Sequence, residues 1–75
     1  MALFKFRARK AREGTPIKVA ITLGGKDRGY TPDAKDQYLL VETQNSGSFT
    51  WSAHYFGKKI DGGNSCGGTI EIVIP

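Results

Sequence analysis

Apolar and polar residues alternate with a period of two along most of this chain, and that pattern restricts its fold more than any other feature. Because successive side chains of a β-strand point to opposite faces, the alternation predicts strands that bury one face. β-Branched and aromatic residues occupy many of the apolar positions, as is typical of strands. The apolar positions of the four alternating runs are Phe4, Phe6 and Ala8; Ile17, Val19, Ile21 and Leu23; Phe49, Trp51, Ala53 and Tyr55; and Ile70, Ile72 and Ile74. Residues 38–43 form a shorter apolar run, which predicts a fifth strand.

Segments rich in glycine and polar residues separate these runs. Residues 24–36 are predicted to form a long loop, and loops of that length often bind ligands. Residues 44–48 are predicted to form the loop of a hairpin. Residues 57–68 hold five glycines among twelve residues, and they are predicted to form a loop because glycine weakens regular elements.

The 75 residues are enough for one small domain with a thin core. We therefore expect residues 1–75 to form a single all-β domain, either an antiparallel five-stranded barrel or a sandwich. The first twelve residues also contain good helix formers. However, Phe4, Phe6 and Ala8 cannot share one stripe of a helix, so a strand is favoured. A flexible basic arm is the remaining alternative for residues 1–12.

Cysteine and histidine are scarce, which excludes two common ways of stabilising a small domain. The single cysteine, Cys66, cannot form an internal disulfide, and with the single histidine, His54, it cannot supply the four ligands of a structural zinc site. We expect no metal and no cofactor, and homo-oligomerisation remains as a route to further stability. No apolar run approaches the roughly 18 residues of a membrane span, and the first residues lack the apolar core of a secretory signal. We therefore expect a cytoplasmic, reducing compartment and no membrane partner.

The positive charge is concentrated at the start of the chain. The net charge is +4, and the first twelve residues contribute +5 through Lys5, Arg7, Arg9, Lys10 and Arg12. In a strand, the first three of these would project from one face at a spacing of about 6.6–6.8 Å. Such a row could follow a phosphate backbone, to which arginine donates paired hydrogen bonds. The alternative is that these charges only improve solubility and discourage pairing between strand edges.

Position along the chain gives the aromatic residues different predicted roles. Trp51 is the single tryptophan and lies on the apolar face of its run, so we predict that it is in the core. Tyr30 falls in a predicted loop and Phe56 lies off the apolar face of its neighbours, so both are candidates for exposed rings on which bases stack. His54 is expected on the surface, and no third group is evident that would make Cys66 a nucleophile. We therefore do not expect an enzyme.

Two functions follow from these features. The first is a small non-enzymatic module that binds nucleic acid, with Lys5, Arg7, Arg9, Lys10 and Arg12 on phosphates and Tyr30 or Phe56 stacking on bases. The second is a structural or interaction protein, such as a phage- or virus-type assembly subunit or an inhibitor. Such a protein would add its last strand, residues 68–75, to the sheet edge of a protein partner or of a second copy. The proline at the end of that segment is compatible with an edge position.

Overall fold

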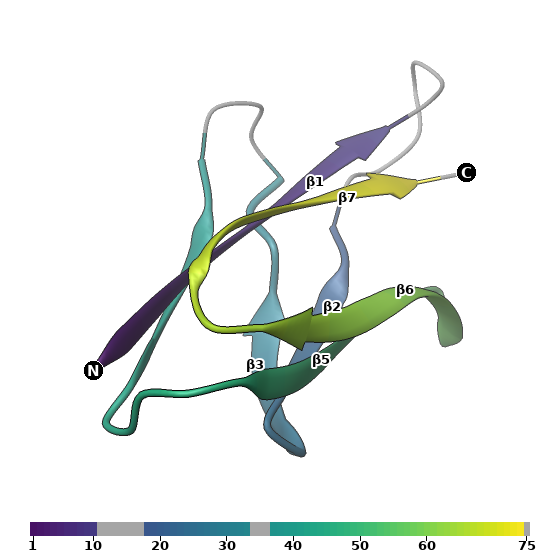
Figure 1. The fold of residues 1–75 in the computed structure, drawn as a ribbon. Helices are drawn as coiled ribbons and strands as arrows, with labels where there is room; N and C mark the ends of the chain where they lie inside the picture. The colour runs from purple at the N-terminus through teal and green to yellow at the C-terminus, as the bar shows by residue number, and fades with distance from the viewer. Residues whose placement is uncertain (11–17, 34–36, 75) are drawn as a thin grey trace.

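Two sheets built from seven strands make up the part of the chain that the computed structural model describes, which is residues 1–10, 18–33 and 37–74 (Figure 1). The strands are β1 (Ala2–Lys10), β2 (Ala20–Leu23), β3 (Lys26–Tyr30), β4 (Leu39–Thr43), β5 (Phe49–Tyr55), β6 (Lys58–Ser65) and β7 (Gly68–Ile74). One sheet has the order β4-β1-β7 and the other has the order β3-β2-β5-β6. The prediction of an all-β domain is confirmed, and the start of the chain is a strand rather than a helix or an arm through Lys10.

The three-stranded sheet brings the first and the last strand together. β1 pairs antiparallel with β4 and parallel with β7, so β1 and β7 lie side by side (Figure 1). Parallel neighbours require a long crossover, and here the intervening strands β2 to β6 form it. The prediction of a wholly antiparallel arrangement is wrong, because this sheet is mixed. The barrel alternative is also wrong, because the strands form two separate, sandwich-like sheets.

The core lies between the sheets and is built from the alternating apolar positions. The rings of Phe4 and Phe6 are fully buried on the inner face of β1. Phe6 packs edge-on against Trp51 of β5, with ring centroids 5.9 Å apart, and Phe4 packs in the same way against Phe49 at 5.7 Å. The predicted core position of Trp51 is confirmed. The other buried apolar residues are Ala2, Ala8, Val19, Ile21, Leu23, Val41, Ala53, Ile72 and Ile74.

The prediction of five strands is wrong because two predicted loops contain β3 and β6. Both strands lie at the edges of the four-stranded sheet, and most of their side chains are exposed. An edge strand that buries little has no reason to alternate apolar with polar residues, so its sequence resembles a loop. Gly62 of β6 also has a local cause, because a Cβ atom there would lie 3.0 Å from the backbone oxygen of Trp51.

The loop at residues 44–48 joins strands as predicted, but it does not form a hairpin. β4 belongs to the three-stranded sheet and β5 belongs to the four-stranded sheet, so the connection passes from one sheet to the other. The two-residue hairpin turns lie elsewhere, between β2 and β3 and between β5 and β6. In the first of them, Gly24 and Gly25 both have positive φ, as this kind of turn requires.

Several predictions concern residues outside the described ranges. Arg12, Ile17, residues 34–36 and Pro75 lie there. Lys10 belongs to β1, where its backbone is in register with Ile74. Within residues 1–10, 18–33 and 37–74, no helix is long and apolar enough to cross a membrane.

Candidate functional site

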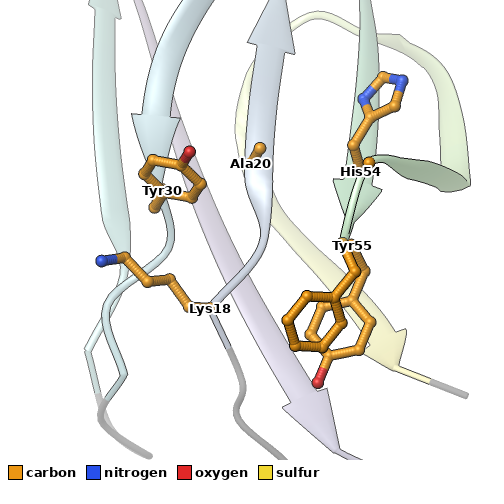
Figure 2. A pocket seen from close by; sticks show the side chains of 7 residues that line it. Lys18, Ala20, Tyr30, His54 and Tyr55 are labelled. Carbon is orange, nitrogen blue, oxygen red and sulfur yellow. The ribbon is translucent and has the colours of Figure 1, made fainter.

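A hollow of about 430 Å³ lies on the outer face of the four-stranded sheet, where β3, β2 and β5 run side by side (Figure 2). Binding sites for small ligands usually have volumes of about 300–1,000 Å³, so the hollow is large enough for one ring system. Its lining is aromatic and basic. The lining residues are Lys18, Ala20, Tyr30, His54, Tyr55, Phe56 and Gly57.

The floor and two walls of the hollow come from one row across three strands. Ala20 of β2 is in register with Tyr30 of β3 on one side and with His54 of β5 on the other. Residues in register share a face of the sheet, so the small methyl group of Ala20 lies between two larger rings. Figure 2 shows the side chains of Tyr30 and His54 on either side of Ala20. Their backbones are about 10 Å apart, which is twice the spacing of neighbouring strands.

Lys18 supplies a positive charge at the Tyr30 wall. Its ammonium group lies 5.0 Å from the centroid of the Tyr30 ring, which is the geometry of a cation–π contact. Its place is fixed by the neighbouring residue, because Val19 and Thr31 extend the pairing of β2 and β3. The Val19 N–H donates to Oγ1 of Thr31 at 2.9 Å, and the Thr31 N–H donates to the Val19 carbonyl at 2.8 Å.

Two further lysines flank the opposite wall. Lys59 of β6 is in register with His54, and Lys58 is in register with Tyr55. The stem of Lys59 lies over Gly62, since its Cε is 3.1 Å from the place where a Cβ of Gly62 would be. Asp27 lies farther along this face, where its carboxylate accepts a hydrogen bond of 3.2 Å from the Thr22 hydroxyl. Lys18 therefore lines the hollow, and Lys58 and Lys59 lie on the strand beyond its opposite wall.

Phe56 occupies a strained place at the edge of the hollow. It forms the two-residue turn between β5 and β6 with Gly57, and its φ of 51° lies in the left-handed region. Bulky residues rarely adopt this conformation, and the strain costs about 1–3 kcal/mol. The ring is 83% exposed, and its centroid lies 4.5 Å from that of Tyr55. An aromatic contact such as this one stabilises the fold by only about 0.5–1.5 kcal/mol.

The structure brings together some of the residues predicted from the sequence. Tyr30 and Phe56 are exposed, as predicted, and both line the hollow. No pattern in the sequence indicated that Lys18 and Tyr55 line the hollow. Tyr55 was expected on the buried face of its run, but a register shift between Ala53 and His54 lies just before it, and its side chain is only partly buried.

The predicted basic row lies on the outer face of the three-stranded sheet. It is partly neutralised there, because Nη1 of Arg7 and Nη1 of Arg9 each lie 3.6 Å from a carboxylate oxygen of Glu71. Glu71 belongs to β7 and is in register with Arg7, whose side chain is only 25% exposed. Among the described residues, Lys5 has no ion pair and stands between Leu40 and Thr69.

The basic row and the hollow face in opposite directions. Phe4 and Phe6 point from β1 toward the other sheet, so Lys5 and its partners in the row point away from it. On β2, Ala20 alternates with the buried Ile21, so the hollow points away from the core on its own side. The residues that the sequence suggested as one site therefore lie on two separate faces.

Cys66 and His54 do not form a reactive pair. Cys66 follows β6 directly, at the end where Ser65 is in register with Phe49. His54 lies five residues farther along β5, so roughly 17 Å of strand separates the two positions. In the described part of the chain, no group of three or more His, Cys, Asp or Glu side chains is arranged to hold a metal ion.

Comparison with known proteins adds no relative. No family model matches the chain, and no curated protein and no solved structure matches it. A proposal for its function therefore rests on the residues of the hollow and of the basic row.

Proposed function

We propose that this protein is a small non-enzymatic module that binds single-stranded nucleic acid, with an unstacked base in the hollow. The observation that carries the proposal is the row in which the rings of Tyr30 and His54 stand on either side of Ala20. Proteins that bind single strands combine exposed aromatic rings, on which bases stack, with positive charge that follows the backbone. A base in a duplex is already stacked on its neighbours, so a hollow of this kind favours single strands.

The width of the hollow fits a flat ring. The backbones of Tyr30 and His54 are about 10 Å apart, and the small side chain of Ala20 leaves the space between them open. A base that enters this space makes contact with aromatic surface on both sides. Every base has such a face, so this arrangement supports binding with little dependence on sequence.

The lysines around the hollow suit the phosphates of the same strand. Lys18 lies on the Tyr30 side, and Lys58 and Lys59 lie on the His54 side. Lys5, Arg7 and Arg9 add positive potential from the other sheet, and Lys10 and Arg12 add charge next to them in the sequence. This potential increases the rate of encounter with a polyanion. Because Glu71 shares its carboxylate between Arg7 and Arg9, we assign direct phosphate contact first to the lysines of the hollow.

Replacing Lys18 with alanine tests the electrostatic part of this proposal. We expect weaker binding of all single strands and a salt dependence whose log–log slope is smaller by about 0.7, because one phosphate contact is lost. Fluorescence polarisation of a labelled oligothymidylate, measured at several salt concentrations, gives both quantities. Lys26→Ala is the matched control, since Lys26 is an exposed lysine of β3 that does not line the hollow. Equal slopes for wild type and Lys18→Ala would contradict the assignment.

Self-association through a sheet edge is a second candidate, and the position of β7 favours it. β7 forms one edge of the three-stranded sheet and pairs only with β1 among the described strands. An unpaired strand edge can add a strand from another chain. Ile72 and Ile74 are buried in the core, so the surface offered to a partner is the backbone edge and exposed side chains such as Val73.

Val73→Lys tests this second candidate. We expect a lysine there to discourage edge pairing, so the molar mass measured by light scattering should stay at one chain while the wild type grows in mass with concentration. Val73→Thr serves as the control, because threonine keeps the shape and the strand preference of valine. A wild type that remains one chain at all concentrations would remove this candidate.

A further inference from the structure

Phe56 is the one described residue other than glycine that has a positive φ. Its φ is 51° and that of Gly57 is 77°, so both central residues of the β5–β6 turn are left-handed. This geometry defines a type I′ turn, in which asparagine followed by glycine is the preferred pair. Gly57 fits that preference and Phe56 does not.

Neither folding nor solubility explains a phenylalanine in this turn. Asparagine would adopt the same backbone with less strain, and it would place an amide rather than a large apolar ring in water. The ring is 83% exposed, so little apolar burial offsets the strain. Its one ring contact among the described residues is with Tyr55, which lies behind it at 4.5 Å with the ring planes tilted by 58°.

Because Phe56 lies at the hollow, its ring is in a position to contact a bound ligand. Phe56 and Gly57 form the end of the lining beyond Tyr55, adjacent to the row of Tyr30, Ala20 and His54. A strained residue that the fold does not need and that borders a binding surface is a candidate for direct contact with the ligand. The contact with the Tyr55 ring restricts the positions that the Phe56 ring can take at the end of the hairpin.

We propose that Phe56 is a second stacking position, so that the protein binds two successive unstacked nucleotides rather than one. One base enters the hollow above Ala20, and the base of the adjacent nucleotide stacks on Phe56. This inference rests on the proposed function, because it adds a position to the same strand of nucleic acid. It identifies the smallest ligand that uses the whole surface as a dinucleotide.

Phe56→Asn separates the effect of this residue on stability from its effect on binding. We expect its melting temperature to rise by roughly 4–8 °C, the shift typical of a small domain when strain at the lower end of the range given above is relieved. We also expect its affinity for a dinucleotide of thymidylate to fall by roughly 5- to 150-fold, the loss that accompanies removal of one stacked base. Its affinity for thymidine monophosphate should fall much less than its affinity for the dinucleotide, since the row of Tyr30, Ala20 and His54 is unchanged. Phe56→Tyr is the control: it keeps a ring on the same backbone, so it should retain dinucleotide binding without the gain in melting temperature.

The measurement is displacement of a labelled oligothymidylate by thymidine monophosphate and by the dinucleotide, together with thermal unfolding of each variant. A Phe56→Asn variant that binds the dinucleotide as tightly as the wild type would overturn the second stacking position and leave the hollow as the binding site. A wild type that binds neither compound nor the labelled strand would overturn the proposed function itself, and the inference with it. A melting temperature that falls in Phe56→Asn would contradict the strain on which the inference depends.

Discussion

Replacing Tyr30 with alanine is expected to weaken binding of a single-stranded oligonucleotide by roughly 5- to 150-fold, because one base stacked on an aromatic ring contributes about 1–3 kcal/mol. The ring is 58% exposed, so its removal should leave the fold intact. The substitution also removes the surface over which the Lys18 ammonium group lies. Fluorescence polarisation titrations of both proteins with the same labelled oligothymidylate measure the change.

Tyr30→Phe is the matched control for this prediction. It keeps the ring and the Lys18 contact and removes only the hydroxyl group, so we expect an affinity close to that of the wild type. Circular dichroism of each variant shows whether the sheets are intact. If Tyr30→Ala bound as tightly as the wild type, the hollow would not be the place where a base stacks.

Replacing Phe6 with alanine is expected to reduce the free energy of unfolding by about 3–5 kcal/mol. Phe6 is fully buried between the sheets, where its ring lies 6.1 Å from Phe4 and 5.9 Å from Trp51 by centroids. The substitution removes both apolar burial and two ring contacts. The core is thin, so few neighbouring side chains can move into the space that is left. A chain of 75 residues has a stability of about 4–11 kcal/mol, so this loss is a large fraction of the total.

Urea unfolding followed by tryptophan fluorescence measures this effect, since the single tryptophan, Trp51, is in contact with Phe6. Lys5→Ala is the control on the same strand: Lys5 is exposed, so its removal should change the stability by no more than about 0.5 kcal/mol. A loss below about 1 kcal/mol in Phe6→Ala would contradict a core centred on β1 and β5.

The fold was predictable from the sequence where strands bury one face and not where they lie at an edge. β1, β5 and β7 bury every second residue over part or all of their length, so alternation identified them. β3 and β6 bury almost nothing, and the glycines of β6 obscured it further. Pairing between the first and last strands was not predictable, because nothing in a local pattern states which distant strand becomes a neighbour.

The candidate site was predictable only in its exposed aromatic residues. Tyr30 and Phe56 stood out because neither belongs to an apolar face. Their meeting at one hollow depends on the register of three strands, with Ala20 between Tyr30 and His54, and register is a long-range property. The net positive charge of the basic row was overestimated from the sequence for the same reason. Glu71 lies far along the chain and reaches Arg7 only through the parallel pairing of β1 and β7.

The most direct test of the hollow as a nucleic-acid site compares two combined variants with the wild type. One variant carries Lys18→Ala, Tyr30→Ala and Phe56→Asn, and the other carries Lys5→Ala and Arg9→Ala on the opposite face. Polarisation of a labelled single-stranded oligonucleotide is measured at roughly 50 and 200 mM salt, over which loss of phosphate contacts is readily detected. We predict that the wild type binds at low salt and more weakly at high salt, that the hollow variant loses binding, and that the variant of the opposite face keeps most of it. A wild type that does not bind at low salt, or a hollow variant that binds as the wild type does, would contradict the proposal.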